Sequence, residues 1–316
     1  MLKHWFKNSY PIHYVIITTL AVIFCITTFL FGDVARHSDF YLYGLIHKST
    51  LVLGIMGVAL YLSSTIYSVH LAQNETLTTK TSSLSAMVFM LLSFYGIFTP
   101  EVMTSILVLW VMSDLMRNVY DHLTNDVHIL SAGTFAALAF IVTPNAFFYV
   151  IVIWAALIIL RIFKFRYLLI SIIGFVVPVL IYFTTLYFTH GQTFAMANIT
   201  PDISLTFNGL YTGIANHAER IYYVVFTAIS IPAAITCLIQ SHNLALSIRR
   251  KYSVVIFALM MGLILSFFSG DASSFLRLSI VPLTFVLSML ITHLSERMEK
   301  IVSLLLIIHP VILFFA

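Results

Sequence analysis

Long apolar stretches, separated by short polar segments, run along almost the whole chain. Eleven stretches are predicted to be helices: Tyr14–Phe31, Thr50–Tyr67, Leu84–Phe98, Val102–Leu115, Ile129–Val142, Ala146–Leu160, Tyr167–Phe188, Ile221–Ile239, Tyr252–Phe268, Phe275–Ile291 and Ile301–Phe315. An apolar run of about 20 residues crosses a bilayer as a helix. Because most of the connecting segments are too short to fold alone, the pattern predicts one all-α transmembrane domain over residues 1–316, a polytopic helical bundle of about eleven helices.

The composition supports a membrane protein over a soluble one. Hydrophobic residues make up 60% of the chain and charged residues 9%, and the mean hydropathy is +1.02. Such a sequence lacks the polar residues that cover a soluble domain. The first apolar stretch is not followed by a small-residue cleavage site, so we expect a retained anchor and not a removed signal peptide.

The basic residues sort unevenly between the two sides of the predicted bundle. With the N-terminus in the cytoplasm, twelve lie inside and four outside. The inside set is Lys3, Lys7, Lys80, Arg117, Arg161, Lys164, Arg166, Arg249, Arg250, Lys251, Arg297 and Lys300, and the outside set is Arg36, Lys48, Arg220 and Arg277. Short cytoplasmic loops carry an excess of Lys and Arg. The sorting therefore predicts a cytoplasmic N-terminus, and it explains the net charge of +4 without nucleic-acid binding.

Residues 84–160 contain an internal repeat with a spacing of 44 residues. Each copy has a Thr-Pro pair, then a tryptophan, then an arginine: Thr99-Pro100, Trp110 and Arg117 in the first, and Thr143-Pro144, Trp154 and Arg161 in the second. This pattern predicts two helical hairpins, each with its Thr-Pro turn on the outer side. The alternative to duplication is that proline turns and interfacial tryptophans are common in membrane hairpins.

The helices of these hairpins are predicted to be short. A helix of 14 or 15 residues is about 22 Å long at 1.5 Å per residue, whereas the hydrocarbon layer is about 30 Å thick. A turn inside the bilayer is tolerated only in protein or beside water. We therefore expect an outward-facing crater with Glu101 and Asn145 at its floor. The alternative is that flanking polar residues extend the helices to the surface.

The longest segment between predicted membrane helices, His190 to Glu219, is predicted to lie outside. It contains many apolar residues, so we expect it to lie on the membrane interface or to fold over the crater as a lid. A surface loop that packs its own side chains is the alternative.

Known cofactor and nucleotide motifs are absent from the sequence. There is no GxxxxGK[ST], GxGxxG, HExxH or CxxC, which argues against an ATP-driven pump or a nicotinamide enzyme, and no cofactor or metal site is predicted. Cys25 and Cys237 lie in apolar stretches and are expected to be packing residues. None of the twelve acidic residues falls in the middle of a predicted span, which weakens an ion-coupled transporter. His309 is the most deeply placed ionisable residue, which makes it a candidate functional residue. The alternative is that it only packs beside Pro310.

Half of the acidic residues gather at the predicted outer face: Asp33, Asp39, Glu101, Asp202, Glu219 and Asp271. We select Asp33 and Asp39 as candidate catalytic residues, because an external carboxylate can act as a general base. Candidate substrate-binding residues are Glu101, Asn145, Arg220, Asp271 and Arg277, with an arginine pairing a phosphate. The alternative for each is a structural role, such as Asp271 capping the helix that follows it.

Three segments resemble a known family: the opening MLKHWFK, the run RIFKFRYLLISIIGFVVPVLIYF from Arg161 to Phe183, and GDASSFLRLSIVPLTFVLSMLI from Gly270 to Ile291. They look like an uncharacterised multipass inner-membrane family of Bacteroidota-type bacteria. The resemblance covers most of the chain through apolar, moderately specific motifs. It implies a bacterial inner membrane and brings no catalytic residue with it.

A second resemblance, in layout only, is to the GT-C glycosyltransferases, which use polyprenyl-phosphate sugars. Those enzymes have acids in the first external loop and short helix pairs beneath an outer cavity. Asp33, Asp39 and the repeated hairpins are similar in arrangement. The first outer loop here is brief and lacks the adjacent acid pair of many members.

The sequence thus favours an envelope protein that handles a lipid-linked substrate at the outer leaflet, in the manner of a GT-C-like transferase. A non-enzymatic scaffold for an envelope complex is the first alternative, and a transporter or flippase is the second. No protein partner can be named from the sequence.

Overall fold

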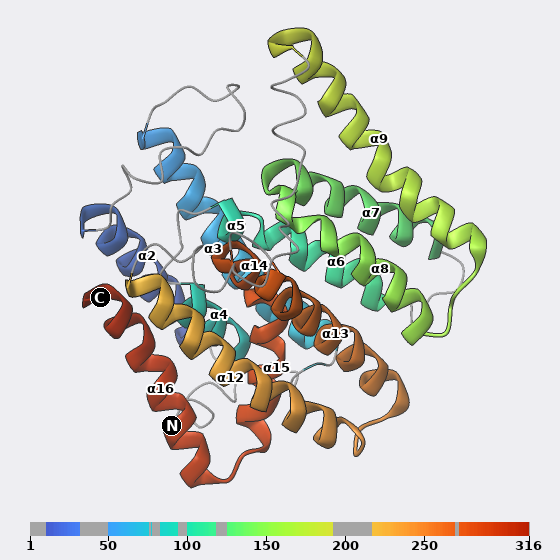
Figure 1. Ribbon diagram of the computed structural model, residues 1–316. Coiled ribbons are helices and arrows are strands. Elements are labelled where there is room, and N and C mark those ends of the chain that lie inside the picture. The colour runs from blue at the N-terminus through green and yellow to red at the C-terminus, as the bar shows by residue number, and fades with distance from the viewer. Residues whose placement is uncertain are drawn as a thin grey trace.

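The computed structural model describes residues 11–31, 50–75, 77, 83–93, 100–117, 125–191, 217–268 and 272–315, and every regular element within these ranges is a helix (Figure 1). The elements are α2 (Pro11–Phe31), α3 (Thr50–Asn74), α4 (Leu84–Ser93), α5 (Pro100–Met103), α6 (Ser105–Arg117), α7 (Asn125–Val142), the 3₁₀ helix η2 (Pro144–Phe147), α8 (Phe148–Ile159), α9 (Phe165–His190), α12 (His217–Ser241), α13 (Leu246–Phe268), α14 (Ala272–Leu278), α15 (Ile280–His293) and α16 (Glu296–Phe315). The all-α prediction is confirmed.

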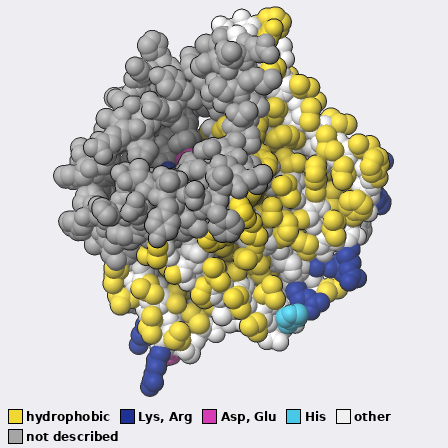
Figure 2. All heavy atoms as spheres, in the orientation of Figure 1, with side chains coloured by type: hydrophobic (Ala, Val, Ile, Leu, Met, Phe, Trp, Pro, Cys, Tyr) yellow, Lys and Arg dark blue, Asp and Glu magenta, His cyan; other side chains and the backbone are white. Residues whose placement is uncertain are grey.

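Three of the described helices are long and apolar enough to cross a membrane, namely Phe165–Thr189, Val224–Ser241 and Leu246–Phe268. The first of them lies within α9, where Phe165 and Phe188 are 70% and 80% exposed. Figure 2 shows hydrophobic side chains over this side of the molecule, with Lys and Arg gathered toward its lower edge. A surface of this kind needs lipid or another apolar partner, and it indicates a membrane protein.

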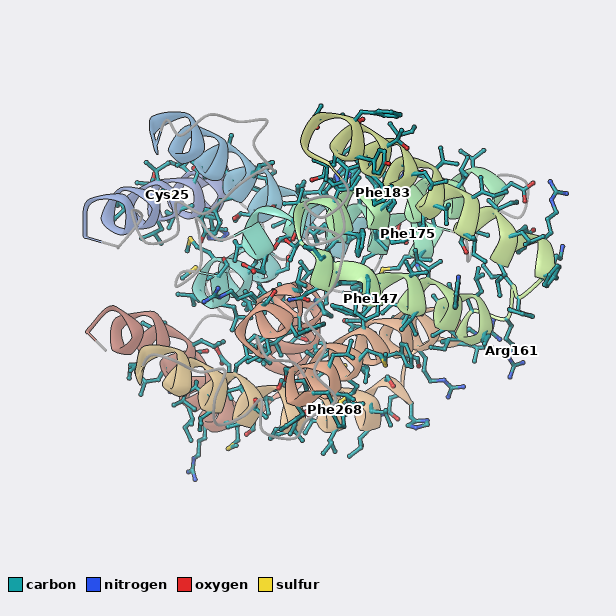
Figure 3. All side chains as sticks on the ribbon, turned by 45° about the horizontal axis from the view of Figure 1, so that its top comes forward. Cys25, Phe147, Arg161, Phe175, Phe183 and Phe268 are labelled. Carbon is teal, nitrogen blue, oxygen red and sulfur yellow. The ribbon has the colours of Figure 1, made fainter. Side chains whose placement is uncertain are left out.

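The helices pack in two connected groups. α7 lies between α6 and α9, while α13 contacts α8, α12, α14 and α15. α4 contacts α3, α15 and α16, and so joins the N-terminal helices to the C-terminal ones. In Figure 3, Phe147 lies between the α7–α9 group and the α13 group, and Arg161 lies at the outer edge. The short turn η2, which contains Phe147, therefore reaches the interior of the bundle, and Arg161 does not.

The predicted repeat corresponds to two units with the same order of elements, but the first is not a packed hairpin, because α4 packs mainly on α3, α15 and α16, and α6 mainly on α3 and α7. After each Thr-Pro pair the chain forms one short helical turn, α5 or η2, and then a longer helix, α6 or α8. Those longer helices have 13 and 12 residues, and Arg117 and Arg161 lie at their far ends. The predicted length was wrong for α7, which has 18 residues because it starts at Asn125 with a polar first turn.

The span predicted over Phe275–Ile291, which Pro282 was expected to bend, consists of two helices in the structure. The chain forms α14 and α15 with a break at Ser279. Pro282 explains the break, because proline has no N–H to donate to the carbonyl four residues earlier, which is that of Leu278, and its ring crowds that carbonyl. The hydroxyl of Tyr149 donates a hydrogen bond of 2.8 Å to the Leu278 oxygen instead. A side chain from the second hairpin thus stabilises the break.

Two glycines set the close approach of α7 and α9. A Cβ atom on Gly133 would lie 2.6 Å from the carbonyl oxygen of Ser171 and 3.3 Å from Cα of Gly174. A Cβ atom on Gly174 would lie 2.5 Å from the carbonyl oxygen of Leu130. Small residues allow helix backbones to approach in this way in membrane proteins. Gly174 therefore serves the packing of α9 on α7.

A buried ion pair joins the end of α3 to the start of α13. Lys251 is fully buried, and its Nζ lies 2.7 Å from Glu75 Oε2 and 3.2 Å from the Glu75 carbonyl oxygen. The neighbouring Tyr252 hydroxyl donates a hydrogen bond to the Leu77 carbonyl. A buried charge needs such partners, because an isolated ion in an apolar interior is very costly. These contacts hold together two segments 176 residues apart.

Candidate functional site

The two short turns α5 and η2, which begin at Pro100 and Pro144, meet a third short element, α14, inside the bundle. α14 contacts both α5 and η2, and it also packs against α12, α13 and α15. α13 approaches it closely at Gly262, where a Cβ atom would lie 1.8 Å from Oγ of Ser279 and 3.5 Å from the carbonyl oxygen of Phe275. The break at Ser279 gives α14 a direction that is not fixed by α15. Polar residues of three separate segments come together at this point.

Glu101 and Arg277 form a buried pair of opposite charge at this point. Glu101 lies in α5 and Arg277 in the last turn of α14. Their side chains are 9% and 8% exposed, and Oε2 of the carboxylate lies 3.8 Å from Nη1 of the guanidinium. This separation is longer than a direct hydrogen bond. The charges attract strongly in a medium of low dielectric constant, yet Oε2 accepts no hydrogen bond from the described residues.

A second polar contact links the other turn to the same helix. The Asn145 amide in η2 donates a hydrogen bond of 3.1 Å to Oγ of Ser274 in α14, and both side chains are buried. The Tyr149 hydroxyl bonds the Leu278 carbonyl one helical turn further along α14. η2 and the start of α8 thus fix both ends of the segment that carries Arg277.

Two buried hydroxyls next to these residues in the sequence make no hydrogen bond with the described part of the chain. They are Oγ of Ser105, at the start of α6, and Oγ1 of Thr143, directly before η2. Buried polar atoms in proteins are nearly always hydrogen-bonded to protein or to water. The region around the turns therefore offers more polar groups than its internal contacts use, as a site for water or a polar ligand would.

Three of the seven residues selected from the sequence lie together: Glu101, Asn145 and Arg277. Their proximity follows from the repeat, because both Thr-Pro turns point toward the same helix. Arg220 lies in the first turn of α12, and its side chain lies outside the described part. Asp33, Asp39 and Asp271 also lie outside the described residues, as do 192–216 of the predicted lid and the side chain of His309.

Sequence reasoning missed the partners that hold this arrangement. Nothing in the sequence indicated that Ser274 contacts Asn145, and Tyr149 carried no signal as part of an apolar run. Among the described residues, no three His, Cys, Asp or Glu side chains are grouped closely enough to hold a metal ion. Cys25 and Cys237 are buried and free. The chemistry of this site therefore rests on a guanidinium, a carboxylate, an amide and hydroxyls.

A family model matches residues 8–316, almost the whole chain, and describes a family of unknown function, DUF6427. The chain belongs to this family. The match includes both hairpins, α14 and the buried Lys251–Glu75 pair. No curated protein and no solved structure is similar enough to match. The DUF6427 assignment thus supports the uncharacterised family expected from the sequence, and it names no activity.

Proposed function

We propose that this DUF6427 protein is a multi-pass protein of the bacterial inner membrane that binds a polyprenyl-phosphate-linked sugar at the outer leaflet. Arg277 binds the phosphate, and the protein acts as a GT-C-like transferase. The observation that carries the proposal is the buried group formed by Glu101, Arg277, Asn145 and Ser274 where the two hairpin turns meet α14.

The distribution of basic residues supports the outer location of this group. Arg117 and Arg161 end α6 and α8 at the opposite end from the Thr-Pro turns. In Figure 1 the connections α8–α9, α12–α13 and α15–α16 all lie toward the lower side of the bundle. The Lys and Arg residues in these connections and in the first two turns of the helices that follow them are Arg161, Lys164, Arg166, Arg249, Arg250, Lys251, Arg297 and Lys300. By the positive-inside rule this end faces the cytoplasm, so the Arg277 group faces the outer leaflet.

A buried arginine suits the phosphate of an amphiphilic substrate. The guanidinium presents a planar set of donors that matches phosphate oxygens, and it keeps its charge in an apolar environment. Glu101 lies 3.8 Å from the Arg277 guanidinium and partly compensates its charge without a direct hydrogen bond. Ser105 and Thr143 supply further hydroxyls for phosphate or sugar oxygens.

The proposed reaction is the transfer of a sugar from polyprenyl phosphate to an acceptor hydroxyl. Asp33 or Asp39 removes the acceptor proton as general base. The acceptor oxygen then forms a bond to the anomeric carbon of the sugar. The bond from that carbon to the phosphate oxygen breaks, and its electron pair leaves with the polyprenyl phosphate. Arg277 stabilises the developing negative charge on the leaving group.

Binding is tested with the purified full-length protein, undecaprenyl phosphate and the uncharged undecaprenol, by native mass spectrometry. We expect the phosphate to bind and Arg277→Gln to weaken its binding by at least about tenfold, as loss of a charge-assisted contact does. Arg277→Lys keeps a charge and is expected to retain part of the affinity. Arg166→Gln, at a guanidinium that is 73% exposed, is the matched control. Equal binding of undecaprenol, or an unchanged affinity in Arg277→Gln, would contradict the proposal.

Catalysis is tested in a bacterium that carries the gene, by replacing Asp33 and Asp39 with alanine singly and together. The readout is the set of envelope glycans, with the abundance of the protein measured in the same cells. We expect glycan loss at normal abundance. Normal glycans in the double variant, with the protein at its normal abundance, would exclude the transferase function. The binding proposal would then still be decided by the mass spectrometry experiment.

A scaffold function is the second candidate, and the exposed apolar face of α9 favours it. Ile173, Leu180 and Ile181 are between 55% and 65% exposed on a helix that packs mainly on α7. The two functions predict different sensitive residues. A transferase loses function in Arg277→Gln and tolerates Ile181→Leu or Leu180→Val, whereas a scaffold that binds through α9 shows the reverse.

A further inference from the structure

A partly polar pocket lies toward the other end of α6, between α3, α6 and α7. It has a volume of about 280 Å³, and its walls include Tyr67, Trp110, Phe135, Asp114 and Arg117. This is close to the lower limit of about 300 Å³ for pockets that hold small molecules. The pocket is thus large enough for the head of an amphiphile and too small for its chains. It shares no residue with the Arg277 group.

Aromatic rings form one side of this pocket. Trp110 lies at the centre: its ring centroid is 6.0 Å from that of Tyr67 and 4.6 Å from that of Phe135, which meets it edge-on. The Trp110 side chain is 42% exposed, so part of the indole is open to a ligand. The faces of tryptophan and tyrosine attract cations, most strongly when the cation is partly removed from water.

Two groups of opposite charge complete the walls. The Asp114 side chain is 11% exposed, and its Oδ1 lies 3.1 Å from Nδ1 of His128 in the first turn of α7. Arg117 lies one turn further along α6 and is exposed. An ammonium group is thus favoured near Asp114 and the rings, and a phosphate is favoured near Arg117. Both side chains line the same pocket, so one ligand that carries both charges can contact them together.

The second hairpin shows that the repeat itself does not require this pocket. Trp154, the counterpart of Trp110, donates a hydrogen bond of 3.1 Å from Nε1 to Ser171 Oγ. The position equivalent to Asp114, 44 residues on, is Ile158, which is 62% exposed. In the second unit the tryptophan is thus hydrogen-bonded to Ser171, and no carboxylate stands at the position of Asp114. Asp114 and the open Trp110 are features of the first hairpin alone.

We propose that this pocket binds the ammonium-phosphate headgroup of a zwitterionic phospholipid from the cytoplasmic leaflet. The ammonium lies against Trp110 and Tyr67 beside the Asp114 carboxylate, and the phosphate is bound by Arg117. The acyl chains stay in the bilayer beside the apolar surface of α7. The proposal rests on the membrane orientation given above and does not depend on the Arg277 site or on any transferase activity.

The test uses full-length protein in nanodiscs that contain phosphatidylglycerol with increasing fractions of phosphatidylethanolamine, followed by release into detergent and native mass spectrometry. We expect phosphatidylethanolamine to be retained in preference to phosphatidylglycerol. Trp110→Leu and Asp114→Asn are each expected to reduce that preference by about tenfold, the scale of a partly desolvated cation–π contact. Phe163→Leu, at an exposed aromatic residue outside the pocket, and Ile158→Val, at the equivalent position of the second hairpin, are the controls.

Arg117→Gln keeps the proposal testable if the buried Asp114 variant does not fold, because Arg117 is exposed. It is expected to weaken retention of phosphatidylethanolamine while the melting temperature stays unchanged. Equal retention of both lipids by the wild type, unchanged selectivity in Trp110→Leu, or unchanged retention of phosphatidylethanolamine in Arg117→Gln would overturn the proposal. Displacement of the lipid by equimolar soluble phosphoethanolamine would assign the pocket to a free metabolite and overturn the lipid assignment.

Discussion

The hydroxyl of Tyr149 donates its hydrogen bond to the carbonyl oxygen of Leu278, 129 residues away, which is the carbonyl that Pro282 leaves without its helical donor. Both partners are buried. Tyr149→Phe therefore leaves a buried oxygen without a partner, and we expect a loss of about 1–3 kcal/mol of unfolding free energy. Thermal unfolding of the detergent-solubilised protein measures it. Tyr187→Phe, at a side chain that is 45% exposed, is the control and is expected to unfold like the wild type.

Gly133→Ala and Gly174→Ala are expected to destabilise the packing of α7 on α9. A Gly-to-Ala change inside a helix normally stabilises it by about 0.5–1 kcal/mol. Here the added Cβ atoms would lie 2.6 Å and 2.5 Å from backbone oxygens, so the helices must move apart. We expect a lower melting temperature for each variant. Leu138→Ala, at an exposed position of α7, is the control for a change elsewhere on this helix. A higher melting temperature in both glycine variants would refute the packing role.

Lys251→Met is expected to cost about 3–5 kcal/mol, because it leaves the Glu75 carboxylate buried without its cation. Adding Glu75→Gln to the same chain removes the uncompensated charge and should restore most of the loss. A double-mutant cycle measured by thermal or denaturant unfolding gives the coupling between the two residues. If the losses of unfolding free energy in Lys251→Met and Glu75→Gln simply add in the double variant, the two residues are not coupled.

Glu101→Gln should act in the opposite direction to Arg277→Gln on anion binding. Glu101 places a negative charge 3.8 Å from the Arg277 guanidinium, and Glu101→Gln removes that charge from the neighbourhood of the guanidinium. We expect undecaprenyl phosphate to bind several-fold more tightly to Glu101→Gln, measured in the same native mass spectrometry titration. Weaker binding would instead show that Glu101 holds Arg277 in position.

The orientation of the chain is tested by cysteine labelling, for which the native cysteines give no background because Cys25 and Cys237 are buried. Phe163→Cys, between α8 and α9, should be protected from a membrane-impermeant maleimide in intact spheroplasts and react after lysis. Thr189→Cys, at the other end of α9, should react without lysis. The reverse pattern would place the Arg277 group in the cytoplasm and exclude an outer-leaflet substrate.

The apolar pattern alone located nearly every described helix, because runs of apolar residues are long and their boundaries are polar. It failed at Phe275–Ile291, where the pattern is continuous and only the position of Pro282 indicated a break. The predicted proximity of Glu101 and Asn145 came from the Thr-Pro repeat, a signal written in the sequence itself.

Contacts between distant segments carried no such signal. Lys251 reads as one more basic residue of a cytoplasmic loop, and nothing near it in the sequence indicates Glu75. Asp114 lay within a predicted span end, and its pairing with His128 depends on how α6 meets α7. The packing partner of Gly174, which is Gly133, becomes visible only in three dimensions.

The interruption at Ser279 lets α14 and α15 take separate orientations, which one continuous helix would have coupled. In an unbroken helix, each residue turns by a fixed angle relative to the next, so the side of the rod that carries Arg277 would be dictated by the side that packs on α4 and α13. With the chain divided, the seven residues of α14 can be aimed at the hairpin turns while α15 keeps its own packing. Substitutions that reshape one of these surfaces need not disturb the other.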